Sequence, residues 1–202
     1  MVRASKTQIQ FRKGDTLTKQ GAFASYVLFV ITGIARQYIE GDGGRTHNLR
    51  IIQPGEFVGL SSVFYTPTFN YSSVALTDCQ VFLIEKEAIG GIVKQNGVFA
   101  FHIIKRYCQQ NAMLYNNLHS NAFKQMNGRM ADTLLYLDTL KTAHPSLFLS
   151  LSRKDVADFA GISTESAVKL LKSFEKDGLI SLQEKDIIVL NRPSMEDISR
   201  RG

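Results

Sequence analysis

Residues 151–191, LSRKDVADFAGISTESAVKLLKSFEKDGLISLQEKDIIVLN, decide how the last third of the chain folds. Ser152 is placed to cap a short helix, and Gly161 supplies the backbone freedom that ends it. Ser163 begins a second helix, with Ser166 three residues later, and Gly178 closes that helix. The second helix has an apolar stripe at helical spacing, made of Ala167, Leu170, Leu171 and Phe174. The stretch therefore predicts two consecutive helices.

A β-hairpin is expected after the second helix. Residues 179–183 form its first strand, the turn is Glu184-Lys185-Asp186, and residues 187–190 form its second strand. Ala157 allows the two helices to cross closely, and Gly161 makes the corner between them. Helix, tight turn, helix and hairpin together are typical of a DNA-binding winged helix-turn-helix.

At this point the sequence resembles the DNA-binding segment of the Crp/Fnr family of bacterial transcription regulators. The recognition helix of that family carries Ser or Thr, then Glu two residues later, then Thr or Ser, and Arg or Lys three residues after that. Here the string is Ser163-Thr164-Glu165-Ser166-Ala167-Val168-Lys169. The family usually has Arg where Lys169 stands. Because Lys lacks the planar bidentate fork of Arg, the half-site is expected to differ or to be read less stringently.

Glu165 and Lys169 lie four residues apart and share one helix face. In a major groove, Glu165 can accept a hydrogen bond from cytosine N4, and Lys169 can donate to guanine O6 or N7. The alternative is a solvated ion pair without a reading role; the corner and the wing favour the reading role. The predicted DNA-binding residues are Arg153, Ser163, Thr164, Glu165, Ser166, Val168, Lys169 and Lys172.

The composition is that of a globular protein, with 44% apolar residues in 202 and a formal net charge of +6. Most of the excess of basic over acidic residues lies in residues 1–121, which hold 12 Lys and Arg against 7 Asp and Glu. Residues 122–202 hold 12 Lys and Arg against 11 Asp and Glu. DNA binding must therefore depend on the local placement of basic side chains. The sequence has no apolar run of membrane length and no signal-peptide pattern at the start, so we expect a cytoplasmic protein without a membrane partner.

Short strand-like runs separated by glycine turns fill the first part of the chain, which predicts a sandwich or jelly-roll barrel. The runs are Ile9–Phe11, Tyr26–Ile31, Gly33–Glu40, Thr46–Ile52, Ser72–Leu76 and Gln80–Ile84. Three strings, FRKGDTLTKQG (11–21), VITGIARQY (30–38) and IIQPGEFVG (51–59), resemble the family's cyclic-nucleotide-binding double-stranded β-helix and occur in family order.

In nucleotide-binding members of the family, a Gly-Glu pair holds the ribose, an Arg-Ser or Arg-Thr pair holds the phosphate, and a Thr-Ser pair on the long helix touches the base. The matching effector-pocket positions here are Gly59, Leu60, Phe69, Asn70, Leu114 and Tyr115, with Asn70-Tyr71 as the alternative for the phosphate pair. Leucine cannot accept a ribose hydroxyl proton, and neither Phe nor Asn supplies a cation. The effector is therefore not expected to be cyclic AMP held in the usual manner, and Arg50 or Arg36 could replace the cation only in a rearranged pocket.

No cofactor is expected, and the effector stays unidentified. An iron–sulfur cluster needs about four cysteine ligands, and the chain has only Cys79 and Cys108, each expected as a buried apolar residue. Haem could use His47, His102, His119 or Cys79, but a lone histidine is more often a surface or core residue.

The pattern changes to helical period at residues 96–119. Phe99, Ile103, Arg106 or Tyr107, Gln110, Leu114 and Leu118 recur at intervals near 3.5, which predicts a seam for a partner helix. In the Crp/Fnr family the equivalent helix pairs with its copy to form a homodimer; the alternative is a helix that packs only on its own barrel. Further apolar positions, among them Val98, Phe101, Ile104, Cys108 and Met113, allow both contacts. A hinge at 120–127, a helix at 128–142 and a strand at Leu147–Leu151 are expected next.

The sequence thus predicts an α+β chain: a jelly-roll sensor barrel (1–95), a dimerisation helix (96–120) and a winged helix-turn-helix domain (121–202). The expected function is sequence-specific transcription regulation by a homodimer on a near-palindromic DNA site, with RNA polymerase as a further partner, and no enzymatic activity. The rival is a ligand-binding or enzymatic cupin-like barrel. Such a barrel needs clustered His and Glu metal ligands, and only His47 lies on the expected strands. A barrel that senses nothing and serves only to dimerise remains open, as does activation versus repression.

Overall fold

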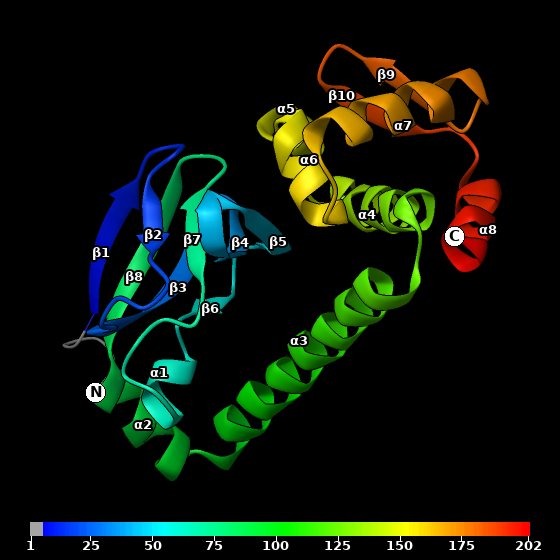
Figure 1. Ribbon diagram of the computed structural model, residues 1–202. Coiled ribbons are helices and arrows are strands. Elements are labelled where there is room, and N and C mark those ends of the chain that lie inside the picture. Colours follow the sequence, from blue (N-terminus) through cyan, green and yellow to red (C-terminus); the bar gives the residue numbers. More distant parts are fainter. Residues whose placement is uncertain (1–5) are drawn as a thin grey trace. The chain divides into compact units, whose positions relative to one another are not determined.

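The computed structural model describes residues 6–202 (Figure 1). The chain divides into two compact units, one ending at Met113 and the other beginning at Leu114. Helix α3 (Gly97–Phe123) is continuous across this boundary. Within residues 6–202, no helix is long and apolar enough to cross a lipid bilayer.

Two four-stranded sheets form the barrel of the first unit, and every hydrogen-bonded neighbour pair is antiparallel. One sheet has the order β1 (Lys6–Phe11), β8 (Cys79–Glu85), β3 (Tyr26–Thr32), β6 (Phe57–Val58). The other has the order β2 (Thr16–Thr18), β7 (Ser72–Ala75), β4 (Ala35–Glu40), β5 (Thr46–Ile52). The mixed α+β class and the jelly-roll barrel are confirmed. Strands β2 and β6 escaped prediction because two or three residues are too few to show alternation.

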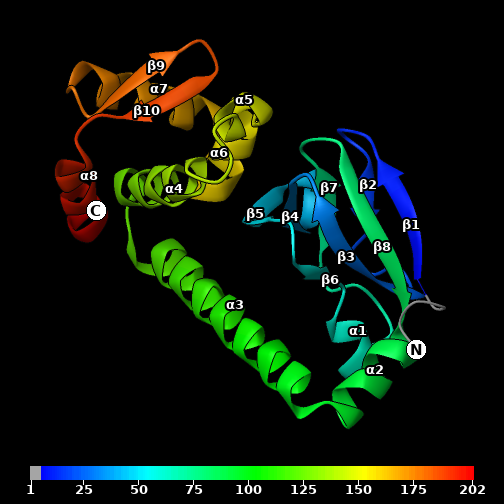
Figure 2. The same ribbon diagram turned by 180° about the vertical axis from the view of Figure 1, so that it is seen from behind.

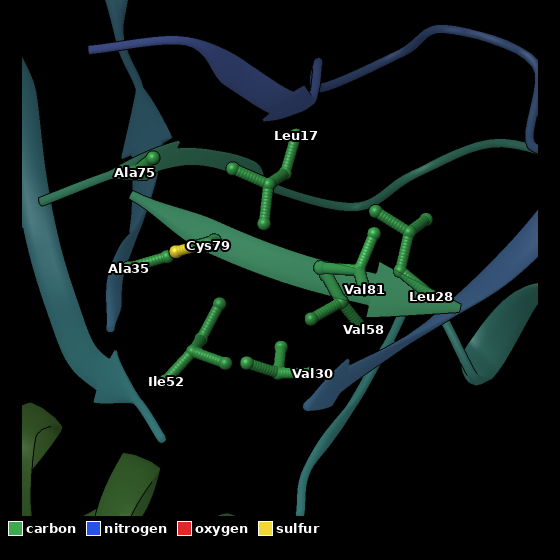
Figure 3. Close-up of a cluster of buried hydrophobic side chains, with 9 residues drawn as sticks. All are labelled: Leu17, Leu28, Val30, Ala35, Ile52, Val58, Ala75, Cys79 and Val81. Carbon is green, nitrogen blue, oxygen red and sulfur yellow. The ribbon is translucent and has the colours of Figure 1, made fainter. Parts of the chain in front are cut away.

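The barrel core lies between the two sheets (Figure 3). Alternate residues of each strand point inward, so that Leu28 and Val30 of β3 meet Cys79 and Val81 of β8. Leu17, Ala35, Ile52, Val58 and Ala75 complete the cluster. Cys79 is buried as expected, but Cys108 is exposed, so the expectation of burial was wrong for Cys108.

A second apolar cluster attaches helices to the barrel. It contains Val27, Leu60, Ile84, Ile89 and Ile103, with Phe57 and Phe99 packed against it. The helices α1 (Ser61–Phe64) and α2 (Lys86–Gln95), neither of them predicted, lie together at one end of the barrel (Figures 1 and 2). Ile103 is the buried residue of α3, which shows that this face of the helix belongs to its own barrel.

The second unit is a small helical fold with a hairpin. Its elements are α4 (Met126–Lys141), α5 (Leu147–Ser150), α6 (Arg153–Ala160), α7 (Thr164–Lys176), β9 (Ile180–Gln183), β10 (Asp186–Val189) and α8 (Arg192–Arg201). The strand predicted at Leu147–Leu151 is wrong, because Leu147 and Phe148 are both buried and form one helical turn beside β10. Consecutive buried residues contradict the period of two that a half-buried strand requires.

The break between helices is shorter than the segment 120–127 that was predicted as a hinge. Only Lys124 and Gln125 interrupt the helical residues between α3 and α4. Ser120 Oγ donates a hydrogen bond of 2.6 Å to Asp132, and Lys124 Nζ donates one of 2.9 Å to the same carboxylate. The end of α3 is thus tied to α4 by a shared acidic side chain.

Candidate DNA-binding surface and sensor site

The corner between α6 and α7 is built by caps. Ser152 Oγ accepts from the Asp155 N–H at 3.1 Å, and the Asp155 carboxylate accepts from the Ser152 N–H at 2.8 Å, which completes a capping box. Gly161 ends α6 at φ 61°, in the left-handed region, and its N–H donates to the carbonyl of Ala157. Ala157, the small side chain that the sequence indicated at the corner, is fully buried, and α6 packs against α7.

Helix α7 presents the predicted reading face to solvent. Ser163 Oγ accepts from the Ser166 N–H at 3.1 Å and caps the helix. Its apolar stripe faces the core, with Ala167, Leu171 and Phe174 buried. The opposite face carries the predicted residues: Thr164, Glu165, Lys169 and Lys172 are exposed, while Ser166 and Val168 are half-buried.

Glu165 and Lys169 form an ion pair of 2.7 Å with side chains that are 79% and 75% exposed. An exposed i,i+4 pair contributes only about 0.3–0.5 kcal/mol to stability. Because this interaction is weak, both groups can exchange it for base edges at small cost. The geometry fits a reading surface whose side chains are held near each other but not locked.

Arg153 lies half-buried beneath the wing. Its guanidinium donates to the carbonyl of Glu184 at 3.0 Å and to that of Lys185 at 3.3 Å. Burial lowers the pKa of Arg153 from its usual value. The side chain predicted to contact DNA therefore holds the wing turn, where Glu184 has a φ of 53°. Lys185 is exposed at the tip of that turn, a basic position that only its place in a hairpin turn could have indicated.

In the sensor unit, two aromatic side chains crowd Gly59. A Cβ added at Gly59, whose φ is 81°, would lie 2.4 Å from Cε1 of Phe69. The Gly59 N–H donates to the hydroxyl of Tyr71 at 2.9 Å. Tyr71 is half-buried, and the desolvation of its hydroxyl raises the pKa of that group. The backbone donor of Gly59 and the space in front of it are thus occupied by residues of the chain itself.

The other predicted effector-pocket residues have different surroundings. Leu60 packs in the cluster that attaches the helices, whereas Phe69 packs against the barrel core. Asn70 is exposed. Leu114 and Tyr115 are exposed on α3, at 42% and 63%.

A buried ion pair lies next to this site. Arg50 of β5 pairs with Glu56, and both are under one tenth exposed. Arg50 Nε also donates to Gln37 Oε1 at 2.9 Å, and Arg106 of α3 approaches the other oxygen of Glu56 at 3.5 Å. Arg50, the cation named as a substitute phosphate ligand, is therefore engaged by Glu56. The same carboxylate links the barrel to α3.

The exposed apolar face of α3 differs from the predicted seam. Phe99 and Ile103 pack on the barrel, so their assignment to a seam for a partner helix was wrong. Among the many exposed positions of α3, one set follows spacings of three and four: Phe101, Ile104, Cys108, Asn111, Tyr115, Leu118 and Ala122. These are the a and d positions of a heptad repeat. The sequence alone could not separate the two faces, because both carry apolar residues at similar intervals.

Comparison with known families matches two parts of the chain. Residues 8–96 match the model of the cyclic nucleotide-binding domain, and residues 128–198 match that of the Crp-like helix-turn-helix domain. The cAMP-activated global transcriptional regulator CRP of Salmonella typhimurium is 25% identical over 179 residues, which cover 87% of this chain and 85% of that protein.

Solved structures show the same fold over nearly the whole chain. FixK2 from Bradyrhizobium japonicum has a TM-score of 0.83 at 22% identity and covers 96% of both chains. The c-di-GMP responsive global regulator CLP from Xanthomonas campestris has a TM-score of 0.79 at 23% identity, covering 92% of this chain and 94% of that one.

Proposed function

Because the chain belongs to the Crp/Fnr family of transcription regulators and carries a helix-turn-helix DNA-binding domain, we propose that it works as a homodimer that reads a near-palindromic DNA site. In this proposal, residues 1–95 are the sensor domain, of which 1–5 lie outside the described residues, 96–120 the dimerisation helix and 121–202 the DNA-binding domain. The protein acts in the cytoplasm, where RNA polymerase is its further partner. It has no enzymatic activity, and no enzyme family is indicated among its relatives.

The observation that carries the DNA-reading proposal is the exposed face at the start of α7. Helix α7 follows a capped corner, and its first turns offer an acceptor at Glu165 and donors at Lys169 and Lys172. The N-terminal turns of a recognition helix are those that reach base edges in the major groove. Glu165 and Lys169 therefore read bases, while Lys172 and the wing residue Lys185 contact phosphates.

The exposed heptad positions of α3 support the dimer. Phe101, Ile104 and Leu118 are 61–65% exposed, which a helix without a partner would leave in water. Two parallel copies of α3 would bury them about a two-fold axis. Such an axis relates two recognition helices and matches a DNA site with two-fold symmetry.

Any effector of the barrel is not a cyclic nucleotide held in the usual manner. Phe69 and the hydroxyl of Tyr71 occupy the surroundings of Gly59, and Arg50 is paired with Glu56. Freeing Arg50 for a phosphate would leave the Glu56 carboxylate without its closest cation in a buried site, which is costly.

Selection of bound duplexes from a random pool by the ligand-free protein, at a fixed salt concentration, tests this function. We expect a near-palindromic site with half-sites about one helical turn apart. Salt-sensitive binding without sequence enrichment, both alone and in the presence of cell metabolites, would contradict the assignment of Glu165 and Lys169 to base reading.

A further inference from the structure

A groove of about 590 Å³ lies between α1, α2 and the first half of α3. On one side it is lined by Phe64 and Tyr65, whose side chains are 53% and 89% exposed. The groove belongs entirely to the sensor unit and opens beside the seam of α3. Exposed aromatic side chains around an apolar hollow mark a surface that another molecule covers.

The other side of the groove is formed by α3. Ala100, Ile104, Tyr107 and Cys108 line it. Ile104 and Cys108 are also d and a positions of the exposed heptad, so the groove continues directly from the face that the proposed dimer buries. Ala100 and Tyr107 are g positions, on the flank of the seam that lies toward α1.

The heptad register identifies what enters this hollow. In a parallel two-stranded coil, each a-position side chain enters a hole formed by the neighbouring d, g, a and d positions of the facing helix. For Phe101 of the partner subunit that hole includes Ala100 and Ile104. For Cys108 of the partner subunit it includes Ile104, Tyr107 and Cys108. All of these hole residues line the groove.

We propose that a second copy of this chain fills the groove, with Phe101 of the partner subunit as the side chain that enters it. This inference rests on the dimer proposed above and extends its interface from α3 onto α1 of the sensor unit. Phe101 is 64% exposed in the single chain, and two residues of the hole that would receive it, Ala100 and Ile104, line the same groove as Phe64 and Tyr65. By symmetry the interface contains two such contacts.

Charge favours a second copy as the occupant. Helix α3 contains no Asp or Glu, and its only Lys and Arg residues are Lys105 and Arg106. Arg106 faces Glu56 of its own barrel. Lys105 is an e position, which faces Ala100 of the partner subunit rather than a cation. Two identical helices can therefore meet along this seam without like charges opposite each other.

The groove wall is also connected to the crowded sensor site. The carbonyl of Gly59 accepts hydrogen bonds from the Ser62 N–H at 3.0 Å and from Ser62 Oγ at 2.7 Å, which fixes the start of α1. Tyr107 of α3 is hydrogen-bonded to Ser61, which is the first residue of α1. A movement of the Gly59 segment would thus move the wall that holds the partner's aromatic ring.

Sedimentation equilibrium of the full-length chain tests the proposal with two variants and two matched controls. Tyr65→Ser and Phe101→Ala should each raise the dimer dissociation constant by at least about tenfold, the effect of a central interface side chain. Phe23→Ser and Phe123→Ala remove exposed aromatic side chains that do not line the groove. These two controls should leave the dimer dissociation constant within about twofold of the wild-type value. Tyr65 is almost fully exposed, so its replacement should not disturb folding, which circular dichroism checks.

A mixed disulfide identifies the occupant directly. In a Cys108→Ser background, chains with Tyr65→Cys and chains with Phe101→Cys should form a cross-linked heterodimer when mixed and oxidised. Chains with Tyr65→Cys alone should not cross-link through this position, whereas chains with Phe101→Cys alone can cross-link because a positions face each other in a parallel coil. An apolar dye, 1-anilinonaphthalene-8-sulfonate, should bind a monomeric Leu118→Glu variant and be excluded from the wild-type dimer.

The outcomes separate this inference from the function on which it rests. A wild-type dimer whose dissociation constant is unchanged by Tyr65→Ser would overturn the groove contact and leave the dimer standing. Equal dye binding by the dimer and the monomeric variant would also overturn it, because the groove would then be open to a small apolar ligand. A wild-type chain that stays monomeric at every concentration, on and off DNA, would overturn both.

Discussion

Replacement of Lys169 by methionine tests the reading face of α7 most directly. Methionine keeps the unbranched apolar stem and helix propensity of lysine but removes its charge. In the free protein the change removes an ion pair between side chains that are 75% and 79% exposed, so the free energy of unfolding should fall by no more than about 0.5 kcal/mol. Any larger loss measured on DNA must therefore come from the complex.

On the selected DNA site the same change should weaken binding by about 1–3 kcal/mol per base contact, a factor of about 5–150. Fluorescence anisotropy at one salt concentration measures the dissociation constant for the selected duplex and for a second duplex in which the guanine proposed to contact Lys169 is replaced by another base. The wild type should discriminate between the two duplexes, and Lys169→Met should bind both almost equally. Lys176→Met is the matched control, because Lys176 is exposed on the same helix near its last turn.

Two results would refute the reasoning. If Lys169→Met lost the same affinity on every duplex and lowered the salt slope by about one, Lys169 would be a phosphate contact rather than a base contact. If it lost nothing on either duplex, the Glu165–Lys169 pair would be a solvated surface pair with no part in DNA binding.

Three further changes test other parts of the structure. Glu56→Gln should lower the stability of the sensor unit by about 3–5 kcal/mol in urea unfolding, because it leaves Arg50 buried without its carboxylate; a loss below about 1 kcal/mol would contradict that burial. Mild oxidation with copper phenanthroline should produce a dimer linked through the exposed seam residue Cys108, whereas Cys79, whose pKa burial raises to about 11, should stay a thiol at pH 8; a dimer that persists in Cys108→Ser would refute this. Arg153→Met should destabilise the DNA-binding unit by about 1 kcal/mol and speed amide exchange at the wing turn, and unchanged exchange would show that its two hydrogen bonds do not hold the turn.

The burial of Cys79 also fixes the direction of a pH effect. Its pKa lies near 9.0 in an unfolded chain and about 11 in the folded barrel, so the folded state disfavours the thiolate. The contribution of Cys79 to stability is therefore fully present below pH 9 and is lost as pH rises toward 11. A Cys79→Val variant, followed by urea unfolding across this range, should show a smaller decline.

The local pattern of the chain determined its elements wherever a single rule governs them. Ser152, Gly161, Ser163 and Gly178 fixed the ends of α6 and α7, because caps and left-handed turns depend on the residue at one position. Alternating runs likewise located six strands of the barrel within a few residues. The same signals identified the helix-turn-helix and the residues exposed on its second helix.

Sequence periodicity did not predict the structure where the position of a side chain depends on contacts with residues far away in the sequence. The apolar residues of α3 recur on two faces, and only the packed barrel shows that Phe99 and Ile103 face inward while Phe101 and Ile104 face solvent. Residues 147–151 form a short apolar run from which a strand was predicted, but the burial of two consecutive side chains beside β10 makes them a helical turn. Tertiary contacts override a weak local preference in a segment this short.

The sequence by itself thus determined that the chain is a barrel joined by a long helix to a winged helix-turn-helix, and which residues a DNA-reading helix would carry. Only the tertiary structure decided that Arg153 holds the wing, that Phe69 and Tyr71 crowd Gly59, and that the free face of α3 adjoins a groove. The reason is physical: caps and periodicity act within a few residues, whereas burial and hydrogen bonding join side chains from distant segments whose meeting depends on the whole fold.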